Sequence, residues 1–229
     1  MDEFMPNRGS DITRSKSAEA LDKEGVTHMR KLVVGTFLSV DGVMQAPGGP
    51  SEDREGGFEH GGWSVNYWDE VMGQLMDEWT LQAGALLLGR KTYDIFAAHW
   101  PHVGGDDPVA VKLNSVAKYV ASRTLDKVTW NNSSLIEGDV AKAVAALKEP
   151  PGSEIQVTGS GDLIQTLIEH DLVDEYRLWV FPVVLGEGKR LFAGGAVPAA
   201  LKLVDTKTSS TGVAIHTYER AGAIQFGSF

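Results

Sequence analysis

Short apolar stretches alternate along the chain with segments in which apolar residues recur at helical spacing. The segment 30–40 is almost continuously apolar and β-branched, which is typical of a strand buried on both faces. Further apolar runs predict strands at 85–88, 118–121, 128–130 and 154–158. Helical spacing predicts helices at 93–98, 108–115, 140–147 and 163–170, and one that Asn66 caps, with Asp69 as capping partner, and that ends near Gln82. This alternation favours a sheet with right-handed, helical crossovers.

The C-terminal part of the chain has a different pattern. The segments 173–184, 201–205 and 212–220 resemble strands and follow one another without helices, which is typical of antiparallel pairing at a sheet edge. The predicted fold class is therefore α/β, with a mixed, mostly parallel central sheet, flanking helices and an antiparallel C-terminal edge. The strands at 173–184 and 212–220 are long and apolar, so we expect a second subunit to cover this edge in a homodimer.

Polar segments divide the chain into three parts. Residues 1–28 hold only scattered apolar side chains and are expected to form a disordered N-terminal extension. Residues 29–220 form the single predicted domain, and residues 221–229 form a C-terminal tail. Within the domain, residues 41–62 are rich in Gly, Pro and acidic residues, and a loop of this length in a compact domain is usually functional or disordered.

The amino-acid composition excludes several classes of binding partner. The chain of 229 residues has 21 Lys and Arg against 31 Asp and Glu, a net charge of −10 that repels nucleic-acid phosphates. The absence of cysteine excludes disulfides, thiol nucleophiles and Cys-ligated metals. No apolar run approaches the roughly 18 residues that a membrane-spanning helix requires. We therefore expect a cytoplasmic protein that binds neither nucleic acid nor membranes.

Two predicted strands run directly into glycine turns that precede helices. The first turn is Gly89, Arg90, Lys91 and Thr92, and the second is Gly159, Ser160, Gly161 and Asp162. A helix N-terminus offers free backbone N–H groups to an anion. Solvated basic residues at a helix start, or a plain tight turn, explain each tetrapeptide equally well. Ser122 and Arg123 follow a third strand, and the three strand ends together predict a basic pocket for a multiply phosphorylated ligand.

Several motifs in this order resemble the dihydrofolate reductase-like superfamily. The most similar branch contains the C-terminal reductase domain of the bifunctional riboflavin-biosynthesis deaminase-reductase. The motifs that carry the resemblance are 31–42, Leu86 to Tyr93, Tyr119 to Arg123, Ile155 to Gly161, and Leu172 to Leu178 with Phe181 to Gly186. The resemblance implies a reductase that uses NADPH as its cofactor and forms a homodimer.

The resemblance also assigns cofactor-binding residues. They fall on the two glycine turns and on the third strand end: Gly89, Arg90, Lys91, Thr92, Ser122, Arg123, Gly159, Ser160, Gly161 and Asp162. Arg90, Lys91 and Arg123 would hold the 2′-phosphate that distinguishes NADPH from NADH. The amides of the second glycine turn would hold the diphosphate.

The substrate side departs from the dihydrofolate reductase pattern. The position of the carboxylate that bonds the pteridine in those enzymes falls on Gly73, which has no side chain to replace it. Asp69 and Asp77 lie one helical turn before and after Gly73 and are the candidate catalytic residues. Asp69 is explained equally well as a helix-capping residue, and Asp77 as a solvated surface residue. Asp41, Trp63 and Pro182 are the candidate substrate contacts. The alternative for Asp41 is a turn at a strand end. The alternative for Trp63 is core packing or a dimer contact, and the alternative for Pro182 is a strand–loop crossing.

The sequence therefore predicts a reductase that transfers a hydride from NADPH to a small heterocycle of the pyrimidine or pteridine type. The alternative is a non-catalytic nucleotide- or flavin-binding module on the same fold, because a fold does not fix a function. No metal site is predicted, since Pro101 disrupts the spacing of His99 and His102 and no carboxylate lies next to them.

Overall fold

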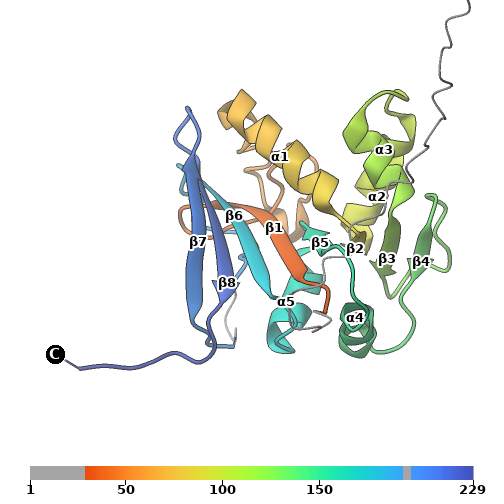
Figure 1. Cartoon of the computed structure of the whole chain (residues 1–229). Helices are drawn as coiled ribbons and strands as arrows, with labels where there is room; N and C mark the ends of the chain where they lie inside the picture. Colours follow the sequence, from red (N-terminus) through yellow and green to blue (C-terminus); the bar gives the residue numbers. More distant parts are fainter. Residues whose placement is uncertain (1–28, 193–196, 229) are drawn as a thin grey trace, which may run out of the picture.

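The computed structural model describes residues 29–192 and 197–228, which are built around one eight-stranded sheet (Figure 1). The strands lie in the order β4-β3-β2-β5-β1-β6-β8-β7. Their bounds are β1 Leu32–Ser39, β2 Ala85–Gly89, β3 Ala117–Ala121, β4 Ser133–Leu135, β5 Ile155–Thr158, β6 Glu175–Phe181, β7 Leu201–Thr208 and β8 Ala214–Arg220. All pairings from β4 to β6 are parallel, whereas β8 is antiparallel to both β6 and β7. The predicted fold class is confirmed.

Five α-helices cover the two faces of the sheet (Figure 1). They are α1 Glu70–Gln82, α2 Arg90–His99, α3 Pro108–Ser115, α4 Val140–Lys148 and α5 Gly161–Glu169. Three short 3-10 helices are η1 Glu55–Gly57, η2 Val65–Tyr67 and η3 Trp100–His102. In the part of the chain that the structure describes, no helix is long and apolar enough to cross a membrane.

The alternation of side chains along the strands separates the core into two layers. Val34 of β1 and Val157 of β5 are fully buried in a cluster with Ile164 of α5. On the other face, Trp179 of β6 packs with Met72 of α1, and a separate cluster under α2 and α3 contains Leu88. The opposite face is thus filled by two clusters, one on each side of the central strands β1 and β5.

The strand predicted at 128–130 is wrong, and the corresponding edge strand is β4, a few residues later. Trp130 is buried beside Tyr93 in the cluster under α2, which accounts for an apolar residue at this position. The backbone N–H groups of Thr129 and Trp130 both donate to the Tyr93 hydroxyl, at 2.8 and 3.0 Å, and not to a neighbouring strand. The apolar run therefore marks a buried loop.

The helix cap predicted at Asn66 is also wrong. Asn66 lies within η2, and α1 begins after Asp69, whose carboxylate accepts the N–H of Met72 at 2.9 Å. The second oxygen of Asp69 accepts the backbone N–H and the hydroxyl of Ser210, both at 2.7 Å. The hydrogen bond from Met72, together with those from Ser210, holds the pKa of Asp69 below its usual value.

The edge of the sheet differs from the sequence-based expectation. The strand β6 lies between β1 and β8, and β8 lies between β6 and β7, so neither of these apolar strands is an edge. At the C-terminal end of the sheet the edge strand is β7, in which Leu203 and Val204 are about half exposed between charged residues. The prediction of a homodimer therefore depends on β7 and not on the strands first chosen for it.

Candidate functional site

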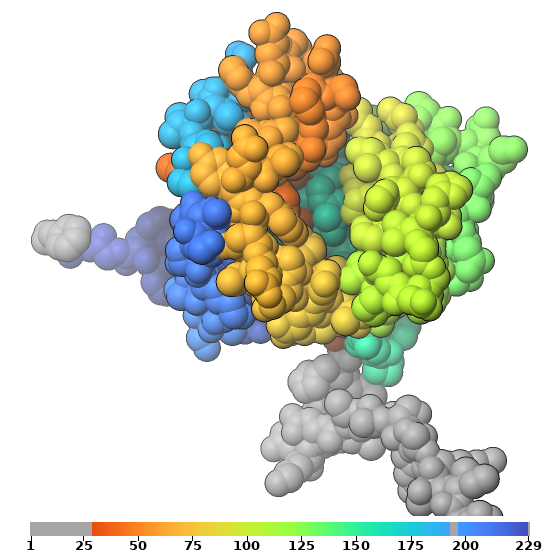
Figure 2. Space-filling view, turned by 90° about the horizontal axis from the view of Figure 1, so that it is seen from above, coloured from red at the N-terminus to blue at the C-terminus, as the bar shows by residue number. Residues whose placement is uncertain are grey.

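A cavity of about 1250 Å³ lies where the strands β2 and β5 separate (Figure 2). These strands pair only from Ala85 with Ile155 to Leu86 with Gln156. Just before this pairing the chains are so close that a Cβ on Gly84 would lie 2.7 Å from the Ser153 carbonyl oxygen. In Figure 2 the hollow opens between the yellow atoms of α1 and the yellow-green atoms of α2 and α3, with the teal of the 150–170 region at its floor. The outer part of the cavity continues around the carboxyl ends of the strands.

Two helices begin at the outer part of the cavity without a side-chain cap. They are α2, which follows Gly89, and α5, which follows Ser160. The other three α-helices are each capped by an aspartate, namely Asp69, Asp107 and Asp139. The first N–H groups of α2 and α5 are therefore free to bind an acceptor that enters the cavity.

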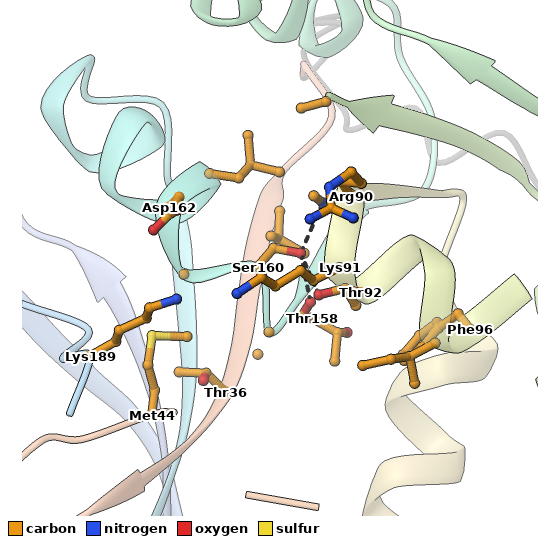
Figure 3. A pocket seen from close by; sticks show the side chains of 18 of the residues that line it. Thr36, Met44, Arg90, Lys91, Thr92, Phe96, Thr158, Ser160, Asp162 and Lys189 are labelled. Atoms are coloured by element: carbon orange, nitrogen blue, oxygen red, sulfur yellow. Dashed lines mark hydrogen bonds between the residues drawn. The ribbon is translucent and has the colours of Figure 1, made fainter. Parts of the chain in front are cut away.

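Ser160 joins these two helix starts (Figure 3). Its hydroxyl accepts the backbone N–H of Gly89 at 3.0 Å and lies 3.0 Å from Thr92 Oγ1. Ser160 has a left-handed backbone with φ 61°, and the preceding Gly159 has φ 57°. A Cβ on Gly159 would lie 3.3 Å from Thr92 Oγ1, so a glycine satisfies both the backbone conformation and the close approach.

All the residues predicted to bind a cofactor line this one cavity. They are Gly89, Arg90, Lys91, Thr92, Ser122, Arg123, Gly159, Ser160, Gly161 and Asp162. Their role in cofactor binding stays a prediction. Met44, the segment 52–55 and Lys189 line the cavity too. Figure 3 shows Met44 and Lys189 on the side of the cavity opposite α2.

Lys91 takes part in a four-residue ionic network. Its ammonium group contacts Asp53 at 3.0 Å and Glu55 at 2.7 Å. Lys189 contacts the same two carboxylates at 2.9 and 2.7 Å. The hydrogen bonds from Lys189 and Lys91 lower the pKa of Glu55 to about 2. Burial opposes the charged form of Lys189, but its hydrogen bonds to Glu55 and Asp53 raise its pKa overall. The network, defined by Asp53, Glu55, Lys91 and Lys189, fastens the 52–55 segment across the mouth of the cavity.

Two arginines next to the strand ends, Arg90 and Arg123, have fewer partners. Arg90 forms an ion pair with Asp94, one turn later on α2, at 3.2 Å, and both side chains are exposed. An exposed pair of this kind is worth little and exchanges readily. Among the described residues, no acidic partner lies within ion-pair distance of Arg123. Arg123 is therefore more available to a ligand than Arg90.

The inner part of the cavity, between α1 and the sheet, is mostly aromatic and apolar. Its walls include Phe37, Met76, Trp79, Phe96 and Trp179. Its polar groups are Thr80, Gln156 and Arg177, and no carboxylate of the described residues lines this part. We call it the inner chamber.

The candidate substrate residues Asp41, Trp63 and Pro182 do not line the cavity. Asp41 accepts the hydroxyl of Ser39 at 2.7 Å and the N–H groups of Leu185 and Gly186, which lower its pKa to about 2. The indole N–H of Trp63 donates to the Gln45 carbonyl at 2.8 Å. The loops around Phe58 and Gly188 lie side by side, since a Cβ on Gly188 would lie 2.9 Å from the Phe58 ring.

The candidate catalytic residues Asp69 and Asp77 do not line the cavity either. Asp69 caps α1, and Asp77 is exposed on that helix. Gly73 is also outside the lining; the residues of α1 that face the cavity are Met76, Trp79 and Thr80. The helix thus presents no acid to the inner chamber, and Gly73, the position counted along the sequence, does not line it.

Comparisons with known proteins agree with this architecture. The protein YyaP of Bacillus subtilis strain 168, itself uncharacterized, is 32% identical over 198 residues, which cover 84% of this chain and 96% of YyaP. A Shewanella sp. PV-4 structure, a candidate riboflavin biosynthesis protein, has a TM-score of 0.61 at 21% identity, covering 83% of this chain and 98% of that one. Enterococcus faecalis dihydrofolate reductase, solved with NADP(H) and RAB-propyl, has a TM-score of 0.53 at 14% identity, covering 86% and 99%. The model of the RibD C-terminal domain matches residues 30–215, and the chain therefore belongs to this family.

Proposed function

We propose that this protein is an NADPH-dependent reductase that transfers a hydride to a small heterocycle of the pyrimidine or pteridine type. The observation that carries the proposal is the pair of uncapped helix N-termini, at Gly89 and Ser160, which face one cavity and are joined by the Ser160 hydroxyl. Membership of the RibD C-terminal domain family supports a reductase.

The outer part of the cavity fits a dinucleotide with a diphosphate and a further phosphate. Gly159 and Gly161 allow close approach of the backbone, and the first N–H groups of α2 and α5 are free to donate to phosphate oxygens. Arg123 would hold the 2′-phosphate, with Arg90 as a second cation once its exposed pair with Asp94 is released. Lys91 is left out of this assignment because Asp53 and Glu55 already bind it.

The inner chamber fits the substrate. When bound, NADPH supplies the hydride, and the protein contributes alignment and exclusion of water. The aromatic walls at Trp79 and Trp179 suit a planar ring, and the chamber is continuous with the outer cavity. A heterocycle in the chamber would therefore lie next to a cofactor held at the strand ends.

Two measurements on the full chain test this function. Isothermal titration calorimetry should show tighter binding of NADPH than of NADH. A screen of NADPH oxidation against pyrimidine and pteridine substrates should then find turnover. Binding without any turnover would favour the non-catalytic nucleotide- or flavin-binding module, and the absence of NADPH binding would refute both the cofactor and the reductase.

A further inference from the structure

We propose that Lys91 and Lys189 form a diphosphate site for which Asp53 and Glu55 of the 52–55 segment compete. The two carboxylates and a phosphorylated ligand would be alternative partners of the same two ammonium groups, so the segment acts as an internal competitive inhibitor. The inference rests on the proposed function in so far as the ligand of the outer cavity carries a diphosphate. It goes further because it assigns Lys189 to ligand binding and gives the segment a regulatory role.

The two lysines reach toward each other from opposite sides of the cavity (Figure 3). Lys91 lies in the first turn of α2, and Lys189 lies between β6 and β7. Glu55 Oε2 accepts a hydrogen bond from both ammonium groups, at 2.7 Å each. Asp53 divides its oxygens between them, with Oδ1 at 3.0 Å from Lys91 and Oδ2 at 2.9 Å from Lys189. Because one carboxylate oxygen reaches both ammonium groups, a phosphate oxygen in its place can do so too.

The segment matches a diphosphate in charge. The hydrogen bonds from the two lysines lower the pKa of Glu55 to about 2, so this carboxylate is ionised at neutral pH. Burial opposes the charged form of Asp53, but its hydrogen bonds from Lys189 and Lys91 lower its pKa overall. Two carboxylates therefore present the same negative charge to the lysines as the diphosphate that links the halves of a dinucleotide.

The contacts of the segment are open to exchange. The side chains of Lys91 and Glu55 are 48% and 60% exposed, and exposed ion pairs contribute little free energy. Among the described residues, the backbone N–H that donates to these carboxylates is that of Glu55 itself, to Asp53, and not one at the start of α2 or α5. A phosphate could bind the ammonium groups and the uncapped helix starts together. The additional donors would offset the advantage that the segment has as part of the same chain.

The exchange should loosen the segment without unfolding the loop. The buried side chain of Gln45 holds the backbone through its Nε2, which donates to the carbonyls of Asp53 and Glu55 at 3.2 and 2.9 Å. These two bonds do not involve the lysines and can persist when the ion pairs are lost. The segment should therefore become more accessible when a diphosphate binds, whereas a lid that closes over its ligand would become less accessible.

Calorimetric titration of the full chain with inorganic pyrophosphate tests the competition. We expect Asp53→Asn/Glu55→Gln to bind pyrophosphate at least about tenfold more tightly than the unmodified protein, because the lysines lose their internal partners. The control Glu59→Gln/Glu187→Gln removes the same charge from exposed positions of the two adjacent loops and should bind like the unmodified protein. Adding Lys189→Met to the first variant should remove its gain. Equal or weaker binding by Asp53→Asn/Glu55→Gln, or an equal gain in the control, would overturn the proposal.

Proteolysis of the unmodified protein keeps the test decisive if a variant fails to fold. With saturating pyrophosphate, a glutamate-specific protease should cleave after Glu55 at least about threefold faster than in sodium chloride of the same ionic strength. Cleavage after Glu59, which is exposed in the same loop, serves as the internal reference. An unchanged or slower cleavage after Glu55 would overturn the proposal. Because pyrophosphate carries no hydride, displacement of the segment without NADPH oxidation leaves this inference standing and refutes the reductase, whereas NADPH turnover without displacement does the reverse.

Discussion

The hydroxyl of Ser160 accepts the backbone N–H of Gly89 at 3.0 Å and so joins the start of α5 to the end of β2, across the opening between β2 and β5. Without this bond the Gly89 N–H would lose its partner, and the two helix starts would lose their direct link. Ser160 adopts φ 61°, a conformation that a non-glycine residue rarely occupies. Local strain of this kind, at a residue that organises a site, is typical of functional positions.

Two substitutions of Ser160 distinguish the contribution of its hydrogen bond from that of its backbone conformation. We expect Ser160→Ala and Ser160→Gly both to weaken NADPH binding by roughly tenfold, because both remove the hydroxyl. Ser160→Gly should be the more stable of the two, since glycine adopts a positive φ without strain. Calorimetry for binding and thermal unfolding for stability measure the two effects. Unchanged NADPH affinity in a folded Ser160→Ala protein would contradict the assigned role.

Arg123 and Arg90 should differ in their contribution to cofactor preference. Arg123→Ala should weaken NADPH by about ten- to a hundredfold and leave NADH nearly unchanged, because a bond between charged groups is worth about 1.5–3 kcal/mol. Arg90→Ala should have a smaller effect in the same direction, since Asp94 already binds it. Lys202→Ala, on the edge strand β7, is the control that removes an equal charge far from the cavity. Equal losses of NADPH and NADH in Arg123→Ala would contradict the 2′-phosphate assignment.

The ionic network at the cavity mouth should fail in acid. The pKa values of Asp53 and Glu55 are lowered in the folded protein, that of Glu55 to about 2 against an ordinary value of 4.5. A lowered carboxyl pKa stabilises the folded state above the ordinary pKa, and the contribution is lost as the pH falls towards the folded value. We therefore expect pepsin, which cleaves beside aromatic residues, to cleave at Phe58, next to this segment, more readily as the pH falls from about 4.5 towards 2. The double variant Asp53→Asn/Glu55→Gln should be cleaved readily even at the upper end of this range.

Glu59→Gln is the matched control for that experiment, because Glu59 is exposed in the same loop. Its cleavage should follow the pH dependence of the unmodified protein. If the double variant were as resistant as the control, the 52–55 segment would be held by contacts other than its ion pairs.

Lys118 should make stability rise with pH in mildly alkaline solution. Its ammonium group donates to the carbonyls of Asn114, Val116 and Asn131 and lies 4.3 Å from the centre of the Trp130 ring. Burial lowers its pKa to about 8 from 10.5, so the unfolded chain binds more protons between these values. The free energy of unfolding should therefore increase from about pH 8 towards pH 10.

Urea unfolding across this range measures the effect. Lys118→Met should lose the rise and should be less stable at neutral pH, because three carbonyl groups lose their donor. The range ends at about pH 10 because burial raises the pKa of Tyr176 from 10 to about 12, and its effect on stability has the opposite sign. A flat profile in the unmodified protein would show that Lys118 does not titrate as proposed.

We also propose that the protein is a homodimer, with β7 covered by the partner. Leu203 and Val204 are 49% and 51% exposed on this edge strand. Light scattering at micromolar concentration should give twice the chain mass of 24.7 kDa. Leu203→Glu should shift the population towards the monomer, whereas Thr206→Glu, also on β7, should have a smaller effect. A monomer in the unmodified protein would refute the proposal.

Local signals predicted most of the elements, and tertiary contacts account for the exceptions. The helix at Pro108–Ser115 was predicted with its observed bounds, because Asp107 and Pro108 mark its start and apolar residues follow at helical spacing. The run around Trp130 was misassigned because the hydroxyl of Tyr93, 36 and 37 residues away, replaces a strand neighbour. Local spacing alone cannot distinguish a buried loop from a short strand.

The same distinction applies to the candidate site. The cofactor residues were found because glycines and basic residues stand next to predicted strand ends. The partners of Lys91 lie 38 and 36 residues earlier, in a loop without periodicity, so nothing in the sequence indicated that its charge is balanced. The position of Gln156 and Arg177 in the cavity wall was missed because each lies within an apolar strand, and the contact of Arg177 with Glu154, 23 residues away, forms only in the folded sheet.

The short pairing of β2 with β5 has a mechanical consequence. Only two residue pairs join the part of the sheet that contains β4, β3 and β2 to the part that contains β5, β1, β6, β8 and β7. We therefore expect the sheet to be most flexible along the line where the cavity opens, and a ligand that contacted both α2 and α5 would link the two parts where the strands do not pair. A bound ligand would therefore reduce the motion between these two parts of the sheet and hold them at a defined distance from each other.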